Sequence, residues 1–203
     1  MNVTKMTNMP KIKRIIFHHA AYDFRSFPIV DDTSTDIDIR KGAEAVFNEV
    51  DSWHLKRWAT GCGYHFAIGN GRGIADGSIQ VWRPMQYQGV HTKGQNHDSV
   101  GIMLLGALQN KMPSRKQVDA VVHIASTLCK LYDLNPLGEY NEMRFALRNK
   151  GPVISGHKDW RGHEANGCPG GLHELLPSIR KSVAALVNLE SFVFPVYSKS
   201  RER

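Results

Sequence analysis

The sequence predicts a single α/β domain in which helices flank a mixed central β-sheet. Three observations support this fold class: 203 residues suit one domain of ordinary size, a hydrophobic content of 41% suits a packed core, and short β-rich runs alternate with amphipathic segments. The expected order along the chain is β-α-β-β-β-α-β-α. We expect the domain to occupy residues 11–187, with an N-terminal extension at 1–10 and a C-terminal extension at 188–203.

The first half of the chain predicts one strand, one helix and a pair of strands. KIKRIIF (11–17) is a β-rich run that ends at two histidines, which indicates a buried strand. Residues 22–40 have the composition of a loop, and apolar side chains at three- and four-residue spacings predict a helix over 41–58. YHFAIG (64–69) and SIQVWR (78–83), separated by a turn-rich stretch, predict neighbouring strands.

The second half predicts two further strands and two helices. VGIMLLG (100–106) is a continuous apolar run, which is typical of a strand in the middle of a sheet. Residues 114–133 carry apolar side chains at helical spacing behind Ser114, a residue type that caps helix N-termini. VISGH (153–157) predicts a last short strand, and residues 171–187 predict a closing helix.

The net charge of the chain indicates which classes of molecule it could bind. A formal net charge of +7 favours an anionic partner, which nucleic acid or a negatively charged cell surface would supply. Lysine and arginine are spread along the chain without a basic helix, a zinc-finger spacing or a set of stacking aromatics. The sequence therefore argues against nucleic acid and favours weak attraction to an envelope surface.

The cysteines and the apolar segments indicate in which cellular compartment the protein is made. Cys62, Cys129 and Cys168 form an odd, sparse set unlike a disulfide framework, so we expect free thiols and synthesis in a reducing compartment. No apolar window has the length needed to cross a bilayer. The basic N-terminal residues are not followed by the apolar region of a secretory signal.

SGHKDWRGHEANGCPG (155–170) concentrates histidine and cysteine in an irregular segment. His157 ends the last predicted strand, Cys168 follows it, and His18 ends the first predicted strand. Because strand ends in such sheets often lie side by side, we expect these side chains to converge. Two imidazoles and a thiolate are good zinc ligands, and three protein ligands leave a fourth position open for water. Taken singly, each is more often a surface histidine or a small buried cysteine.

Four stretches resemble the zinc-dependent N-acetylmuramoyl-L-alanine amidases, the family that includes small phage lysozymes and the peptidoglycan recognition proteins. They occur in the family's order and are IIFHHAA (15–21), GYHFAIG (63–69), GVHTKGQNHDSVGIMLLG (89–106) and GHKDW…CPG (156–170). The resemblance covers nearly the whole chain. It implies the family's fold and a Zn²⁺ ion bound by His18, His157 and Cys168.

The resemblance also implies roles for residues beside the zinc. Tyr64 of GYHF matches the active-site tyrosine, whose hydroxyl would stabilise charge on the attacked carbonyl oxygen; the alternative is a core aromatic with its hydroxyl at the rim. The family often has Lys or Thr two positions before the cysteine, where this chain has Asn166. Asn166 is the predicted catalytic helper because it can donate a hydrogen bond, although it carries no charge. His163, Glu164 and Lys158 are the alternative helpers.

HTKGQN (91–96) matches a family stretch that lines the substrate groove. The resemblance implies that His91 and Asn96 donate hydrogen bonds to the muropeptide, and a plain polar turn is the alternative. His65 lies on the other face of the strand from Tyr64 and is predicted to be structural. His19 is predicted to point away from the metal for the same reason.

Together these features imply a peptidoglycan hydrolase that uses zinc-activated water to cleave the amide between N-acetylmuramic acid and L-alanine. We expect a monomeric phage or prophage endolysin, made in the bacterial host cytoplasm and acting on the cell wall after release. One alternative is a non-catalytic peptidoglycan-binding module. The other is an intracellular muropeptide-recycling amidase, which the cysteine at position 168 disfavours because those enzymes tend to have Asp there.

Overall fold

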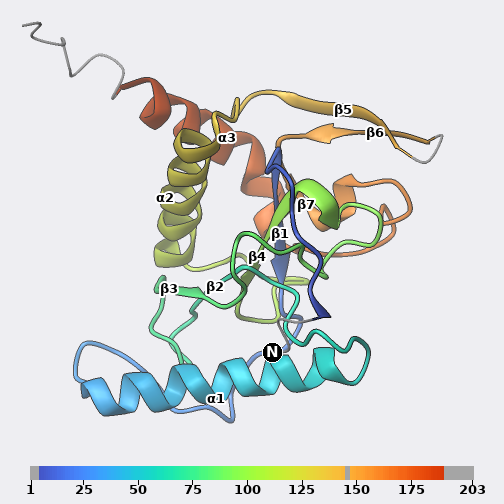
Figure 1. The fold of residues 1–203 in the computed structure, drawn as a ribbon. Helices are drawn as coiled ribbons and strands as arrows, with labels where there is room; N and C mark the ends of the chain where they lie inside the picture. Colours follow the sequence, from blue (N-terminus) through green and yellow to red (C-terminus); the bar gives the residue numbers. More distant parts are fainter. Residues whose placement is uncertain (1–4, 145–146, 190–203) are drawn as a thin grey trace, which may run out of the picture.

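A five-stranded sheet forms the middle of the molecule (Figure 1). The computed structural model describes residues 5–144 and 147–189. The strands of the sheet, in spatial order, are β3 (Ile79–Val81), β2 (Phe66–Ile68), β4 (Ser99–Leu104), β1 (Arg14–His19) and β7 (Ile154–Gly156). β3 is antiparallel to β2, whereas the pairs β2–β4, β4–β1 and β1–β7 are parallel. The predicted mixed sheet is therefore confirmed.

The strand predictions hold in type and neighbourhood and differ at the ends. β4 is the central strand, as its continuous apolar run predicts, and β2 pairs with β3. β1 begins later than the predicted 11–17 and continues through both histidines, because its backbone follows β4 in register from Arg14 opposite Ser99 to His19 opposite Leu104. The register thus carries His18 and His19 inside the strand.

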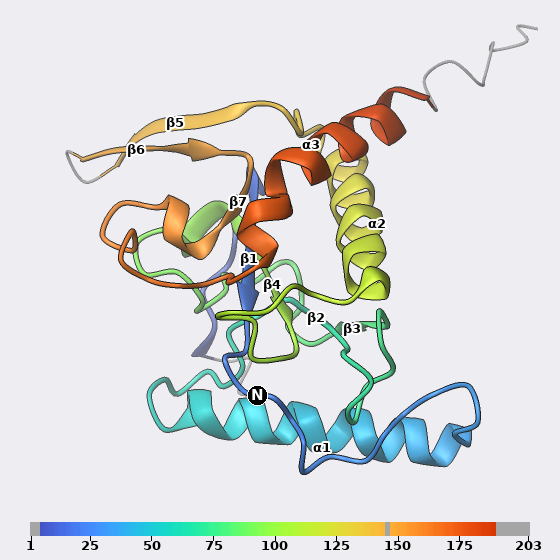
Figure 2. The same cartoon turned by 180° about the vertical axis from the view of Figure 1, so that it is seen from behind.

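Three helices cover the two faces of the sheet (Figures 1 and 2). They are α1 (Asp36–Leu55), α2 (Arg115–Tyr132) and α3 (Leu172–Leu189). Alternate strand residues enter two separate cores: Ile102 and Leu104 pack with α2 and α3, and Met103 packs with α1. This alternation places α1 on one face and the α2–α3 pair on the other. No described helix has an apolar stretch long enough to cross a membrane.

The helix starts follow their capping residues. Ser114 caps α2, as predicted, and also forms a capping box with Gln117. The prediction that 22–40 is loop throughout is wrong at its end, because Thr35 and Asp38 form a second capping box and α1 begins at Asp36. The Ser/Thr and acidic residues that suggest a loop are here the N-terminal signal of a helix.

A two-stranded hairpin, β5 (Glu139–Arg144) with β6 (Leu147–Pro152), is absent from the predicted order of elements. It extends outward near β1 and β7 in both views (Figures 1 and 2). Its sequences EYNEMR and LRNKGP lack the apolar alternation of a half-buried strand. The buried Tyr140 ring, which packs against Ile16 and Trp160, anchors the hairpin to the domain.

The chain ends extend the domain beyond the predicted limits where they are described. Asn8 forms a β-bridge with Tyr87, and Met9 is buried in the core, so part of the predicted 1–10 extension packs on the domain. α3 runs to Leu189, past the predicted end at 187. The rest of the predicted C-terminal extension, residues 190–203, lies outside the described residues.

Candidate metal centre

Three predicted zinc ligands converge beside the ends of β1 and β7. His18 is near the end of β1, His157 follows β7 directly, and Cys168 lies in the segment before α3. Their ligand atoms all lie within 4.8 Å of one another. The parallel pairing of β1 with β7 produces this meeting, because parallel strands end at the same edge of a sheet.

The donor set and its spacing fit zinc. His18 Nδ1 lies 3.7 Å from Cys168 Sγ. In a tetrahedral site with Zn–N of about 2.0 Å and Zn–S of about 2.3 Å, a nitrogen and a sulfur ligand lie about 3.5 Å apart. Two imidazoles and a thiolate suit Zn²⁺ better than Mg²⁺ or Ca²⁺, which prefer oxygen ligands.

Burial keeps the histidine ligands neutral. Desolvation lowers the pKa of His18 well below its ordinary value, and the neighbouring histidines add to this effect. Desolvation likewise lowers the pKa of His157 to about 4. Burial raises the pKa of the Cys168 thiol to about 12, although the His19 backbone N–H donates to the sulfur at 3.3 Å. A cation at this position would bind neutral imidazoles and displace the thiol proton.

His19, predicted to point away from the metal, and His65, predicted to be structural, both hydrogen-bond to the backbone. His19 points to the opposite face of β1, where its Nδ1 accepts hydrogen bonds from the Ala21 and Leu108 N–H groups. His65 Nδ1 accepts from the Gly101 N–H, and its Nε2 donates to the Tyr87 carbonyl. Both rings are therefore committed to the backbone.

Tyr64 lies beside the metal cluster. Its ring packs edge-on against the His18 ring with centroids 5.2 Å apart. It precedes β2 rather than lying within it, which differs from the predicted strand over 64–69. Burial raises the pKa of the phenol above its ordinary value, so the hydroxyl remains a neutral hydrogen-bond donor.

His91 and Asn96, the predicted substrate-binding pair, lie on the side of His18 away from Cys168. His91 is buried, and its Nδ1 lies 3.1 Å from His18 Nε2. Asn96 Oδ1 accepts hydrogen bonds from the N–H groups of His91 and Thr92, so its carbonyl shapes the turn. A cavity of about 440 Å³ adjoins this turn. Its lining includes His91 and Asn96 and also Trp58, Val90, Thr92, Lys93 and Gly94.

The predicted helper, Asn166, also makes a local contact. Its Oδ1 accepts a hydrogen bond from the Cys168 N–H at 2.9 Å, which positions the cysteine. Of the alternative helpers, Lys158 donates its backbone N–H to the Cys168 carbonyl, and Glu164 accepts from the Gly162 N–H. The His163 ring lies 3.0 Å from the ring nitrogen Nε2 of His157.

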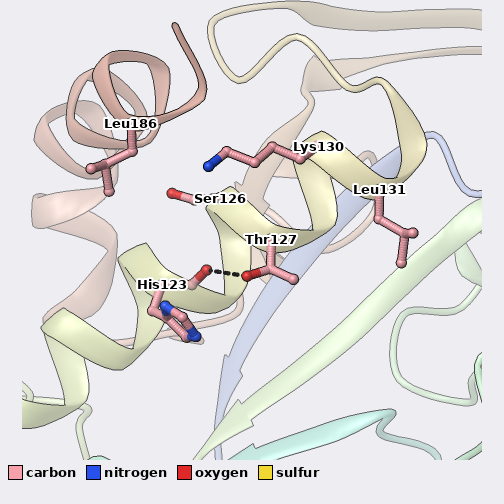
Figure 3. Close-up of a pocket in the computed structure, with 6 residues that line it drawn as sticks. All are labelled: His123, Ser126, Thr127, Lys130, Leu131 and Leu186. Carbon is pink, nitrogen blue, oxygen red and sulfur yellow. Dashed lines mark hydrogen bonds between the residues drawn. The ribbon is translucent and has the colours of Figure 1, made fainter. Parts of the chain in front are cut away.

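A larger cavity, of about 610 Å³, lies between α2 and α3 (Figure 3). Its lining comprises His123, Ser126, Thr127, Lys130, Leu131 and Leu186. Thr127 is engaged with its own helix, since its hydroxyl donates to the His123 carbonyl. None of these residues belongs to the metal cluster, whereas the smaller cavity beside the turn at 91–96 includes His91, which contacts His18.

The matched family agrees with the geometry of this centre. The family of N-acetylmuramoyl-L-alanine amidases, Amidase_2, matches residues 8–171. The chain belongs to this amidase family. The match includes every predicted site residue, from His18 to Cys168. It ends just before α3.

Curated relatives of this amidase-family chain match over shorter segments. The endolysin of Escherichia phage T7 is 35% identical over 63 residues, which are 31% of this chain and 38% of the endolysin. Peptidoglycan-recognition protein 2 of Holotrichia diomphalia is 35% identical over 72 residues, which are 35% of this chain and 36% of that protein. The matches thus span little more than a third of the length of these relatives.

Solved structures of amidases and recognition proteins share the fold. The amidase LysC from Clostridium intestinale URNW superposes with a TM-score of 0.57 at 22% identity, over 90% of this chain and 89% of that chain. Drosophila PGRP-LB superposes with a TM-score of 0.59 at 22% identity, over 86% and 85%. The predicted amidase and peptidoglycan-recognition-protein fold is therefore confirmed for this amidase-family chain.

Proposed function

We propose that this chain is a zinc-dependent peptidoglycan amidase that hydrolyses the amide between N-acetylmuramic acid and L-alanine of the stem peptide. One observation carries the proposal: His18, His157 and Cys168 meet within 4.8 Å in a member of the N-acetylmuramoyl-L-alanine amidase family. Membership of the family indicates the class of reaction, and the two imidazoles and the thiol indicate that the metal is zinc.

In this proposal, one group of residues binds the metal and another stabilises the negative charge that develops during the reaction. When bound, zinc supplies a Lewis acid and lowers the pKa of a water to about 7. His18, His157 and Cys168 hold it. Tyr64, a neutral phenol beside His18, donates a hydrogen bond to the oxygen on which negative charge develops. Asn166 uses its Oδ1 on the Cys168 N–H, which leaves its NH₂ group as the donor for the same oxygen.

The cavity beside the turn at 91–96 is the proposed binding site for the muropeptide. Trp58 offers an aromatic face and Lys93 a cation, which suit the apolar and the carboxylate parts of a stem peptide. The recognition proteins PGRP-LCa and PGRP-LCx, which share this fold with a TM-score of 0.59, were solved with tracheal cytotoxin bound. The net charge of +7 favours approach to an anionic wall.

The phage endolysins among the relatives support a lytic role. In this proposal the chain acts as a monomer, is made in the cytoplasm of a bacterial host and reaches the wall after release. Its partner is the peptidoglycan itself.

The test compares the full chain with Cys168→Ser and with a matched control, Cys129→Ser. Cys129 is also a buried free thiol, but it lies in α2. We expect the Cys168 variant to lose bound zinc and to stop clearing a suspension of purified peptidoglycan, while the Cys129 variant keeps both. Full lytic activity in the Cys168 variant would refute the proposal.

The second candidate function is a non-catalytic peptidoglycan-binding module. The uncharged Asn166, at the position where the family often has Lys or Thr, favours it. A zinc-loaded protein that sediments with insoluble peptidoglycan but releases no stem peptide would establish this function in place of the first. Mass analysis of the soluble fragments makes the distinction.

A further inference from the structure

We propose that His91 and His163 are positioning residues that determine which ring nitrogen the two histidine ligands present to the metal. The inference rests on the proposed zinc site. Each positioning histidine contacts the Nε2 atom of one ligand: His163 Nδ1 lies 3.0 Å from His157 Nε2, and His91 Nδ1 lies 3.1 Å from His18 Nε2.

The direction of the hydrogen bonds at His157 follows from the Lys93 carbonyl. His163 Nε2 lies 3.1 Å from the Lys93 oxygen, and a carbonyl oxygen can only accept. The hydrogen of a neutral His163 is therefore on Nε2, and its Nδ1 is an acceptor. His157 must then donate through Nε2, which leaves its Nδ1 lone pair for a metal.

The same argument applies at His18 and begins at Ser99. The Ser99 hydroxyl donates to the Gln95 carbonyl at 2.6 Å, so its oxygen accepts from His91 Nε2 at 3.4 Å. His91 Nδ1 is thus an acceptor, and His18 Nε2 donates towards it and towards Thr92 Oγ1, which lies 3.1 Å from His91 Nδ1 and 3.3 Å from His18 Nε2. The remaining nitrogen, His18 Nδ1, is the one that faces Cys168 Sγ at 3.7 Å.

Both hydrogen-bond chains end on one segment, residues 93–95, through the carbonyls of Lys93 and Gln95. That segment is itself fixed, because the buried Arg14 guanidinium donates to the side chain and the carbonyl of Gln95. Asn96 closes the turn from the other side. The turn that borders the proposed muropeptide cavity therefore also orients both histidine ligands.

His163 provides the sharper test because its side chain is only half-buried and its segment is irregular. His163→Ala removes the acceptor beside His157. His163→Asn places an amide oxygen close to the position of Nδ1 and retains that acceptor. Lys93→Ala keeps the backbone carbonyl, and His123→Ala removes an exposed histidine on α2.

Two measurements on the full-length chain decide the matter. In zinc competition with a chromogenic chelator, we expect His163→Ala to bind zinc about 10- to 100-fold more weakly and His163→Asn to lose less. Lys93→Ala and His123→Ala should match the unsubstituted chain in zinc affinity. In NMR spectra of the metal-free protein, the His157 Nε2–H should be protected from exchange with water, and His163→Ala should abolish the protection.

Unchanged zinc affinity and unchanged protection in His163→Ala would overturn the inference, as would an asparagine variant as weak as the alanine variant. These results are separable from failure of the proposed function. If the unsubstituted chain binds no zinc, the proposed function fails in its metal requirement, and the NMR measurement still tests the hydrogen bonds in the metal-free protein.

Discussion

At the scale of single residues, desolvation is the largest cause of the pKa shifts of His157, Cys168 and Tyr64 at the candidate metal centre. It lowers the pKa of His157 to about 4, raises that of Cys168 to about 12 and keeps Tyr64 a phenol. The site therefore consists of neutral donors, of which His18 and Cys168 are buried and His157 is half-buried. Such a site favours a divalent cation that brings its own positive charge.

Tyr64→Phe tests the proposed role of the phenol. The change removes one hydroxyl and preserves the ring that packs on His18, so we expect kcat to fall by about 10²- to 10³-fold with zinc content unchanged. Release of stem peptide from purified peptidoglycan gives kcat, and metal analysis gives zinc content. An unchanged kcat would show that the hydroxyl takes no part in the reaction.

At the scale of elements, one buried guanidinium joins β1, β4 and the β5–β6 hairpin. Arg14 at the start of β1 donates to the Asp98 carboxylate next to β4, at 2.9 Å and 2.5 Å. Its guanidinium lies 3.8 Å from the Tyr140 ring centroid and 4.4 Å from that of Trp160. The Tyr140 hydroxyl donates to the same carboxylate. The hairpin is thus connected to the sheet through a buried ion pair.

We expect Arg14→Met to lower the free energy of unfolding by about 3–5 kcal/mol, because it leaves the Asp98 carboxylate buried without its cation. A double variant, Arg14→Met with Asp98→Leu, should recover part of the loss since no buried charge remains. Urea denaturation at fixed pH measures both.

The control is Arg115→Ala, whose ion pair with Asp119 is exposed on α2 and should contribute less than about 1 kcal/mol. A loss for Arg14→Met no larger than this control would contradict the assigned role of the buried pair. A double variant no more stable than the single one would show that shape rather than charge accounts for the loss.

At the scale of the whole molecule, buried neutral histidines link stability to pH. Desolvation is the largest cause that lowers the pKa of His54 and of His65 to about 4, from an ordinary value of 6.5. Between these values the unfolded chain binds more protons than the folded chain. The free energy of unfolding therefore decreases as pH falls from about 6.5 towards about 4.

Thermal unfolding of the zinc-free protein should show this dependence. We expect Tm to be nearly constant above pH 7 and to fall steadily between pH 6.5 and pH 4. His54→Asn should reduce the slope, because the amide oxygen can replace Nδ1 as acceptor for the Gly63 N–H without titrating. A Tm independent of pH across this range would contradict the lowered pKa values.

Much of the fold could be predicted because its signals are local. The apolar run of β4, the helical spacing behind Ser114 and the adjacency of β2 and β3 each depend on a few neighbouring residues. The hairpin β5–β6 could not be predicted, since its strands are polar and its buried contacts, such as Tyr140 with Trp160 and Asn149 with Gln95, depend on how the chain folds. The start of α1 differs from the predicted position, although its capping box is a local signal.

The candidate site also has parts that could be predicted from the sequence and parts that could not. His18, His157 and Cys168 follow from motifs at strand ends, and the parallel pairing of β1 and β7 then brings them together. Contacts such as that of His163 with Lys93 could not be predicted, because they join segments that are distant in the sequence and share no pattern. The contact of Asn166 with the Cys168 N–H is short in sequence, but its direction depends on how the loop folds.

The sequence by itself determined the family, the sheet with its helices and the three candidate metal ligands, because these depend on patterns within short segments. Only the tertiary structure decided which residues contact the ring nitrogens of His18 and His157, where the hairpin attaches and how Arg14 is neutralised. These features depend on hydrogen bonds between residues distant in the chain, such as Arg14 with Asp98. The strength of these hydrogen bonds depends on the removal of water from both partners during folding, which a local sequence pattern cannot indicate.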